Sequence, residues 1–199
     1  LVDFTPAGIS ENGMLLFERN PGGAPVNMLT AAAKSGAKTA FIGKVGKDMH
    51  GLFLKDMTEG AGIHTSSLVL SEDAFTTLAF VELSNSGERN FSFARKPGAD
   101  TRLAYKEIKE ELLADTKVFH IGSLSLTDDP SRTTTFQAVR TAKALGAVIS
   151  YDPNYRAPLW ENRETAMERM RSMVQYVDIM KLSDEETGLL TPYTEPKEA

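Results

Sequence analysis

The chain has 199 residues, of which 41% are hydrophobic and 25% charged, a balance that indicates a globular protein with a core rather than a disordered chain. Its 22 basic and 27 acidic residues give a formal net charge of −5, which argues against binding nucleic acid through a basic surface. Cysteine is absent, which excludes disulfides, thiolate zinc sites and cysteine nucleophiles and favours a cytoplasmic protein. The longest apolar runs, such as residues 14–17, are far shorter than the roughly 18–20 residues of a membrane span, so we expect no membrane partner.

Helices and strands are predicted to alternate along most of the chain. In the first half, a Pro-Gly-Gly turn precedes a helix over residues 27–35, which Gly36 ends, and a strand (39–46) and a helix (51–60) follow. In the second half the predicted order is a charged helix (103–114), a strand (117–122), a helix (131–145), a strand (147–152), a helix (164–176) and a strand (177–182). This alternation is typical of parallel βαβ units, and it predicts an α/β fold with a doubly wound, mostly parallel sheet flanked by helices.

Two stretches, of about residues 5–19 and 65–98, break the alternation. In the second, residues 78–83, 84–88 and 89–95 indicate a strand, a turn and a strand. We expect both stretches to form a small antiparallel sheet, inserted into the α/β domain as a lid over the carboxyl ends of the parallel strands. A second subunit can cover the apolar face of this lid where the chain itself does not.

The two ends of the chain suggest a fragment. It starts inside an apolar strand without an initiator methionine, and it ends in a polar, proline-containing loop at residues 191–199. We therefore expect residues 1–199 to form one incomplete α/β domain.

Near the N-terminus, polar or flexible residues follow a predicted strand. Gly22 and Gly23 precede a helix, and they either form a simple turn with a helix cap or let a ligand approach the backbone. This segment matches neither the phosphate-binding loop nor the dinucleotide fingerprint. Asp3, at a strand end, either caps a loop or accepts hydrogen bonds from hydroxyl groups, as carboxylates that bind sugars do.

Two further polar segments follow parallel strands in the second half. Asp152, Asn154 and Arg156 can bind a polar substrate or neutralise phosphate charge, or they can be a capping aspartate and surface residues. Ser183 and Glu186 have the spacing of a helix capping box. The carboxylates there, together with Lys181, can alternatively serve a magnesium-bound phosphate through water.

Taken in order, these segments resemble the PfkB, or ribokinase-like, family of carbohydrate kinases over nearly the whole chain. The residues that carry the resemblance are Gly22-Gly23-Ala24-Pro25-Val26-Asn27, Ser35-Gly36, Gly43 to Asp48, Gly51, Asp152-Pro153-Asn154 and Lys181-x-Ser183-x-x-Glu186. Within the family the chain resembles the fructokinase-like branch, on residues 1–4, 18–25, 120–126, 151–156 and 181–183. Serine at position 183, where the family usually has asparagine, is typical of that branch.

The resemblance implies phosphorylation of a sugar's primary hydroxyl, with ATP and Mg²⁺ as cofactors. By position it assigns sugar binding to Asp3, Gly22, Gly23, Asn27, Phe93, Arg95, Ser123 and Asp152. It assigns nucleotide binding to Asn154, Arg156, Lys181 and Ser183, a supporting catalytic role to Arg156, and magnesium binding through water to Glu186. The family's Gly-Ala-Gly-Asp segment, which supplies the catalytic base and an anion hole, does not occur in these 199 residues. We therefore expect the C-terminal ATP-binding third to be missing and the chain alone to be inactive.

Fructose, converted to fructose 6-phosphate, is the expected substrate. A kinase for 2-keto-3-deoxygluconate or another sugar acid is an alternative, in which Arg95 and Arg156 would pair with the substrate's carboxylate. A non-catalytic sugar-binding protein is a second alternative. A dinucleotide-dependent dehydrogenase is a weaker one, because no dinucleotide fingerprint follows any strand. The resemblance also implies a homodimer formed through the lid.

Overall fold

The computed structural model describes residues 1–83 and 89–193 and has two compact units. The N-terminal unit is Leu1–Asp100 and the C-terminal unit is Thr101–Ala199, and the 3₁₀ turn η1 (Ala99–Arg102) contains the boundary between them. Each unit contains parallel strands and helices, which confirms the predicted α/β class. In the described part of the chain, no helix has the length and apolar character needed to cross a membrane.

In its described residues, the N-terminal unit contains two sheets and two helices. Its elements are β1 (Val2–Ile9), β2 (Leu15–Pro21), α1 (Ala24–Lys34), β3 (Ala40–Gly46), α2 (Met49–Gly60), β4 (His64–Ser71), β5 (Leu78–Leu83) and β6 (Arg89–Ala94). Strands β3 and β4 pair in parallel, and β2, β1, β5 and β6 form a four-stranded sheet in that order. The core of the unit is formed by Val2, Val45, Leu54 and Leu68, with phenylalanine side chains packed against them.

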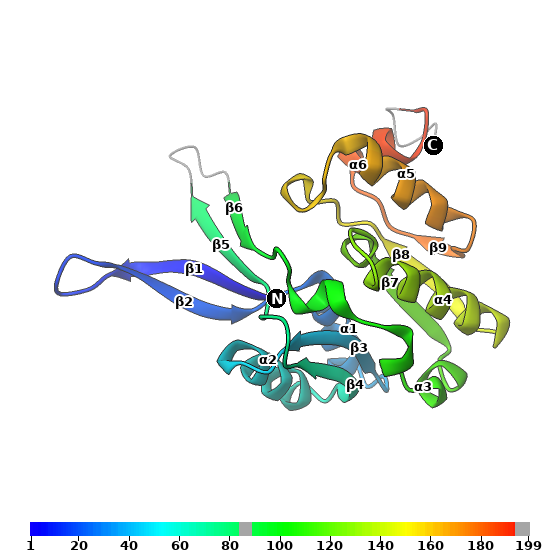
Figure 1. Cartoon of the computed structure of the whole chain (residues 1–199), viewed down its shortest axis with the longest axis horizontal. Helices are drawn as coiled ribbons and strands as arrows, with labels where there is room; N and C mark the ends of the chain where they lie inside the picture. The colour runs from blue at the N-terminus through cyan, green and yellow to red at the C-terminus, as the bar shows by residue number, and fades with distance from the viewer. Residues whose placement is uncertain (84–88, 194–199) are drawn as a thin grey trace. The chain divides into compact units, whose positions relative to one another are not determined.

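The four-stranded sheet consists of two antiparallel hairpins, β1–β2 and β5–β6. They are joined by a parallel pairing of β1 with β5 over Val2–Phe4 only, and beyond it the hairpins diverge (Figure 1). Aromatic packing also links the two hairpins, because Phe4 of β1 stacks on Phe80 of β5 with 5.2 Å between the ring centroids. The expected antiparallel sheet is therefore present, but residues 65–71 do not belong to it, because they lie in β4 and pair in parallel with β3. The turn expected at residues 84–88 lies outside the described residues.

The segment from Gly43 to Gly51 has a structural role that the spacing of its glycines did not reveal. The carboxylate of Asp48 caps α2, accepting the N–H groups of His50 and Gly51 at 2.9 Å, and it also accepts the N–H of Thr76 at 2.8 Å. Burial of Asp48 raises its pKa, but the hydrogen bonds that its carboxylate accepts together lower the pKa by more. The pKa of Asp48 therefore lies below its ordinary value. A Cβ on Gly46 would lie 2.1 Å from Asp48 Oδ2, so glycine leaves the space that this network needs.

The C-terminal unit is built around a parallel sheet with the strand order β7-β8-β9. Its strands are β7 (Val118–Gly122), β8 (Val148–Asp152) and β9 (Ile179–Met180). Its helices are α3 (Glu110–Ala114), α4 (Ser131–Ala144), α5 (Arg163–Val174) and α6 (Asp184–Leu190), with 3₁₀ turns η2 (Tyr105–Glu107), η3 (Ser123–Leu126) and η4 (Ala157–Leu159). Strand β8 contacts α4, and its residues alternate, with Ile149 and Tyr151 fully buried and Val148 exposed.

The charged helix predicted over residues 103–114 is wrong. The segment forms η2, then extended backbone at Ile108, and only then the short helix α3. Leu103, Ile108 and Leu113 are all buried. Their spacing of five residues does not place them on one face of a helix, so a continuous helix would leave part of this apolar set in solvent.

Candidate functional site

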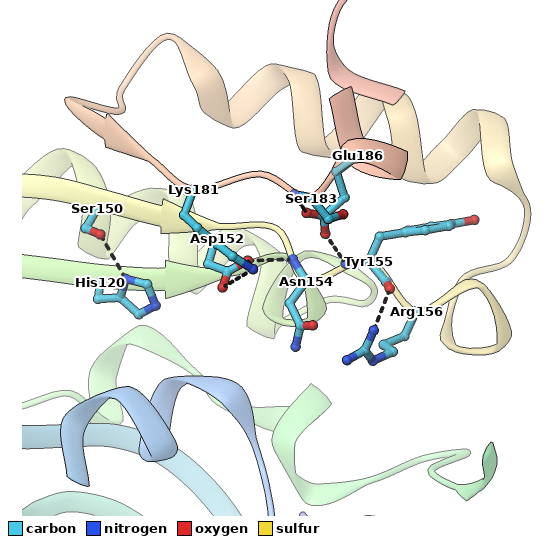
Figure 2. A network of polar contacts seen from close by, with 9 residues as sticks. All are labelled: His120, Ser150, Asp152, Asn154, Tyr155, Arg156, Lys181, Ser183 and Glu186. Atoms are coloured by element: carbon cyan, nitrogen blue, oxygen red, sulfur yellow. Dashed lines mark hydrogen bonds and ion pairs between the residues drawn. The ribbon is translucent and has the colours of Figure 1, made fainter. Parts of the chain in front are cut away.

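Polar residues of the C-terminal unit converge at the carboxyl ends of β8 and β9. They line a cavity of about 230 Å³, formed by Asn154, Tyr155, Arg156, Lys181, Ser183, Glu185 and Glu186. Figure 2 shows the loop after β8 lying beside the segment that leads from β9 into α6. Because β8 and β9 are parallel neighbours, their carboxyl ends share one edge of the sheet, which is where ligands bind in open α/β sheets.

The last residue of β8, Asp152, makes contacts in two directions. Its Oδ1 accepts the N–H of Asn154 at 3.2 Å, and its Oδ2 lies 3.3 Å from the Lys181 ammonium nitrogen (Figure 2). Asn154 has a φ of 45°, in the left-handed region, which asparagine tolerates better than most residues. One carboxylate therefore shapes the loop after β8 and contacts the cation at the end of β9.

Glu186 holds two segments together. Its Oε1 accepts the N–H of Tyr155 at 2.7 Å, its Oε2 accepts the N–H of Ser183 at 2.8 Å, and the residue is only 4% exposed. The bond to Ser183 is one half of the predicted capping box, whereas the Ser183 side chain makes no cap hydrogen bond among the described residues. The bond to Tyr155 is long-range, and it fastens the loop after β8 to the start of α6.

The cavity is lined by two cations and two carboxylates, with neutral hydrogen-bonding groups beside them. Lys181 and Arg156 both line it, and Arg156 donates from Nη1 to the carbonyl of Tyr155 at 3.3 Å. Asn154 and Ser183 add neutral hydrogen-bonding groups. A guanidinium and an ammonium beside hydrogen-bond donors are suited to phosphate oxygens.

The site offers no protein cage for a metal ion. Within residues 1–83 and 89–193, no three carboxylate or imidazole groups are placed to share one ion. Both oxygens of Glu186 already accept backbone N–H groups, so direct coordination by this residue would compete with those bonds. A divalent ion here would need most of its ligands from phosphate and water, which is how Mg²⁺ is commonly held.

In the N-terminal unit, the structure brings Asp3 and Gly22 into contact. A Cβ on Gly22 would lie 2.2 Å from Asp3 Oδ2, so the missing side chain makes room for the carboxylate. Gly23 precedes α1 with a φ of 116°, a conformation open to glycine. Asn27, in the first turn of α1, is exposed and its backbone N–H donates to the carbonyl of Gly23 at 3.1 Å. The helix starts without a side-chain cap.

Arg95 and Phe93, the predicted contacts from the antiparallel sheet, differ in their surroundings. The Arg95 side chain is only 5% exposed, and its Nε and Nη2 lie 2.8 and 2.7 Å from Asp100 Oδ2. Thr77 donates to the other oxygen of Asp100. Phe93 stacks on Phe91, with ring centroids 6.0 Å apart. The guanidinium of Arg95 is thus engaged within the unit, whereas Phe93 is half-buried on β6.

Ser123 and His120 lie at or near the carboxyl end of β7. Ser123 is fully buried, and its N–H donates to the carbonyl of Pro153 at 3.0 Å, whereas its Oγ has no hydrogen-bond partner in the described part of the chain. His120 Nδ1 lies 3.0 Å from Ser150 Oγ on β8. Burial lowers the pKa of His120, and the charge of Asp152 offsets only part of that effect. The sequence reasoning missed the pair of His120 with Ser150, although the register of two parallel strands would have found it.

Comparison with known proteins identifies the family. The sequence model described as pfkB family carbohydrate kinase matches residues 14–199. The probable fructokinase-5 of Arabidopsis thaliana is 42% identical over 193 residues, covering 96% of this chain and 60% of that protein. The crystal structure of fructokinase from Xylella fastidiosa superposes with a TM-score of 0.90 at 38% identity, covering 96% of this chain and 61% of that one.

Structures with bound ligands are similar too. The Xylella fastidiosa fructokinase with bound ATP superposes with a TM-score of 0.89 at 38% identity, covering 96% of this chain and 60% of that one. The fructokinase from Vibrio cholerae O395, in a form with fructose, ADP and calcium ion bound, gives 0.86 at 31% identity, with 99% and 62% of the two chains covered. The chain thus spans about 60% of the length of these relatives. The family model, the fold and the resemblance read from the sequence agree, and the chain belongs to the pfkB family of carbohydrate kinases.

Proposed function

We propose that the protein transfers the terminal phosphoryl group of ATP to a primary hydroxyl of a sugar, and that fructose, giving fructose 6-phosphate, is its substrate. The observation that supports this most directly is the cavity at the ends of β8 and β9, which Arg156 and Lys181 line with positive charge. The similar structures with ATP, or with fructose and ADP, contain ligands of the same chemical classes.

In the C-terminal unit, we propose that the nucleotide's phosphates bind to the side chains around this cavity. Lys181 and Arg156 would balance phosphate charge, and Asn154 and Ser183 would donate hydrogen bonds. ATP supplies the phosphoryl group when it is bound. Phosphoryl transfer depends mainly on positioning and charge stabilisation, so cations fixed near the phosphates are the chief contribution of this unit.

In the N-terminal unit, we propose that Asp3 accepts hydrogen bonds from sugar hydroxyls. Its carboxylate lies against Gly22, where the absence of a side chain makes room for it. We also propose sugar contacts for the other residues that the family resemblance assigns, which are Gly23, Asn27, Phe93 and Arg95 in this unit and Ser123 and Asp152 in the C-terminal unit. The catalytic base is proposed to lie outside these 199 residues, because they contain no Gly-Ala-Gly-Asp segment.

We propose that Mg²⁺ binds with the nucleotide, held mainly by phosphate and water and by Glu186 at most through water. A cytoplasmic location is proposed from the absence of cysteine. A homodimer through the four-stranded sheet is proposed because the β1–β2 hairpin exposes apolar side chains, with Ile9 65% and Met14 67% exposed. Light scattering tests the dimer, and a monomer at micromolar concentration would contradict it.

A coupled assay of ATP turnover tests the activity. The full-length product of the gene that encodes this chain is supplied with Mg²⁺ and, in separate reactions, equal concentrations of fructose, glucose, ribose and 2-keto-3-deoxygluconate. Turnover with fructose is expected. Turnover with 2-keto-3-deoxygluconate alone would favour the sugar-acid kinase. If none of the four sugars gives turnover but fructose still raises the melting temperature, the result would favour a non-catalytic sugar-binding protein.

A further inference from the structure

We infer that Asp152 is a positioning residue for Lys181, and that it acts on phosphate binding through that lysine. This inference rests on the proposed function, because it takes the cavity beside Lys181 as the place where phosphate binds. The inference replaces the sugar contact proposed above for Asp152 with a role in holding the Lys181 ammonium beside the phosphate site.

The geometry supports this role because the two residues end neighbouring strands. Asp152 is the last residue of β8, and Lys181 directly follows β9, which pairs in parallel with β8. The Lys181 ammonium lies 3.3 Å from one carboxylate oxygen of Asp152 and 3.5 Å from the other. Figure 2 shows the lysine side chain extending across the end of β8 toward this carboxylate.

The Lys181 side chain is largely exposed, so few protein contacts besides Asp152 hold it in one position. Its side chain is 67% exposed, whereas that of Asp152 is 21% exposed. A lysine side chain is long and flexible, and it loses conformational entropy when it is held in one position. Asp152 is itself fixed by the hydrogen bond from the N–H of Asn154, so it offers a stationary anchor. Part of the cost of ordering the lysine is then met before phosphate arrives.

Charge and positioning make opposite predictions for this aspartate. A carboxylate beside a phosphate site repels the ligand, so charge alone predicts that removing it tightens anion binding. If Asp152 instead holds Lys181 in place, removing the carboxylate weakens anion binding. The sign of the change therefore separates the two explanations.

The experiment measures binding of inorganic tripolyphosphate, by titration calorimetry, to the full-length product of the gene that encodes this chain. Asp152→Asn removes the charge but keeps an oxygen that can accept the Asn154 N–H, and we expect affinity to fall about three- to fivefold. Lys181→Met should weaken binding about tenfold or more, since it removes a charged donor. In the Lys181→Met background, Asp152→Asn should cause no further loss, because the residue through which it acts is gone.

The chain offers a matched control in Asp178. Its carboxylate also contacts a lysine, Lys143 at 3.0 Å, and also accepts a backbone N–H, from Ile149 at 2.8 Å, but it does not line the cavity. Asp178→Asn should leave tripolyphosphate affinity within about twofold of the wild type. If Asp152→Asn does not fold, Asp152→Glu keeps the carboxylate and should retain affinity within about threefold, whereas Asp152→Ala should not.

The outcomes distinguish this inference from the proposed function. Equal or tighter binding by Asp152→Asn, or a further loss in the Lys181→Met background, would overturn the positioning role while leaving wild-type binding and ATP turnover intact. Failure of the wild type to bind tripolyphosphate would overturn the phosphate site itself. In turnover assays, a raised KM for ATP with Asp152→Asn and an unchanged KM for fructose would support the inference, and the reverse pattern would support contact of Asp152 with sugar.

Discussion

Glu186→Ala should destabilise the C-terminal unit strongly, because one buried carboxylate holds two segments together. The substitution removes the acceptor of the Tyr155 and Ser183 N–H groups, at 2.7 and 2.8 Å. Each hydrogen bond to a charged group contributes about 1.5–3 kcal/mol. Tyr155 is half-buried and Ser183 is exposed, so water replaces part of the loss and the expected cost is about 2–4 kcal/mol. For a chain of this size, that is a drop in melting temperature of roughly 4–16 °C.

Thermal unfolding followed by circular dichroism measures the effect. The matched control is the neighbouring Glu185, which is exposed, so Glu185→Ala should change the free energy of unfolding by no more than about 0.5 kcal/mol. Glu186→Gln keeps one acceptor oxygen and should fall between the two. If Glu186→Ala unfolds within about 0.5 kcal/mol of Glu185→Ala, the carboxylate does not hold the two segments and the argument is refuted.

Two further predictions concern the N-terminal unit. Gly22→Ala places a Cβ 2.2 Å from Asp3 Oδ2 and should lower the free energy of unfolding in urea by about 1–3 kcal/mol. Gly60→Ala is the control, because a Cβ there has no atom within 4 Å, and it should not lower this free energy. Equal stability of the two variants would contradict the close approach of Gly22 to Asp3. The folded-state pKa of Asp48 is lowered, so its contribution to stability is complete above its ordinary pKa of 3.8 and is lost as the pH falls through the lowered value. Asp48→Asn should therefore flatten the acid end of the stability profile, and an unchanged profile would show that Asp48 carries no such linkage.

Local patterns predicted local structure well, and long-range contacts were mostly beyond them. The spacing of Ser183 and Glu186 predicted a capping box because both partners lie within one helical turn. The second bond of Glu186, to Tyr155, joins residues that are distant in the chain and has no local pattern. Asp48 shows the same contrast, since its cap on α2 is local but its bond to Thr76 depends on the folded unit.

The candidate site was predictable as far as strand order was predictable. Alternating helices and strands implied parallel strands whose carboxyl ends meet, and the structure brings Asn154, Lys181 and Glu186, which follow two such strands, around one cavity. The burial of Arg95 against Asp100 could not be read from the sequence, because the charge of an arginine does not reveal whether its partner is a ligand or the protein. The predicted helix over residues 103–114 failed for a related reason, since helix propensity was judged without the packing that decides the burial of Leu103.

The parallel pairing of β1 with β5 also sets an order of events during synthesis. Val2 pairs with Leu78, so the first hairpin can form early on the ribosome, but its neighbour in the sheet does not yet exist. About 60 residues separate the end of β2 from the end of β5, so at about 5–20 residues per second the wait is roughly 3–12 s. Throughout that time the edge of β1 that later pairs with β5, from Val2 to Phe4, lacks its strand partner. Until β5 is synthesised, this edge can therefore pair with another chain.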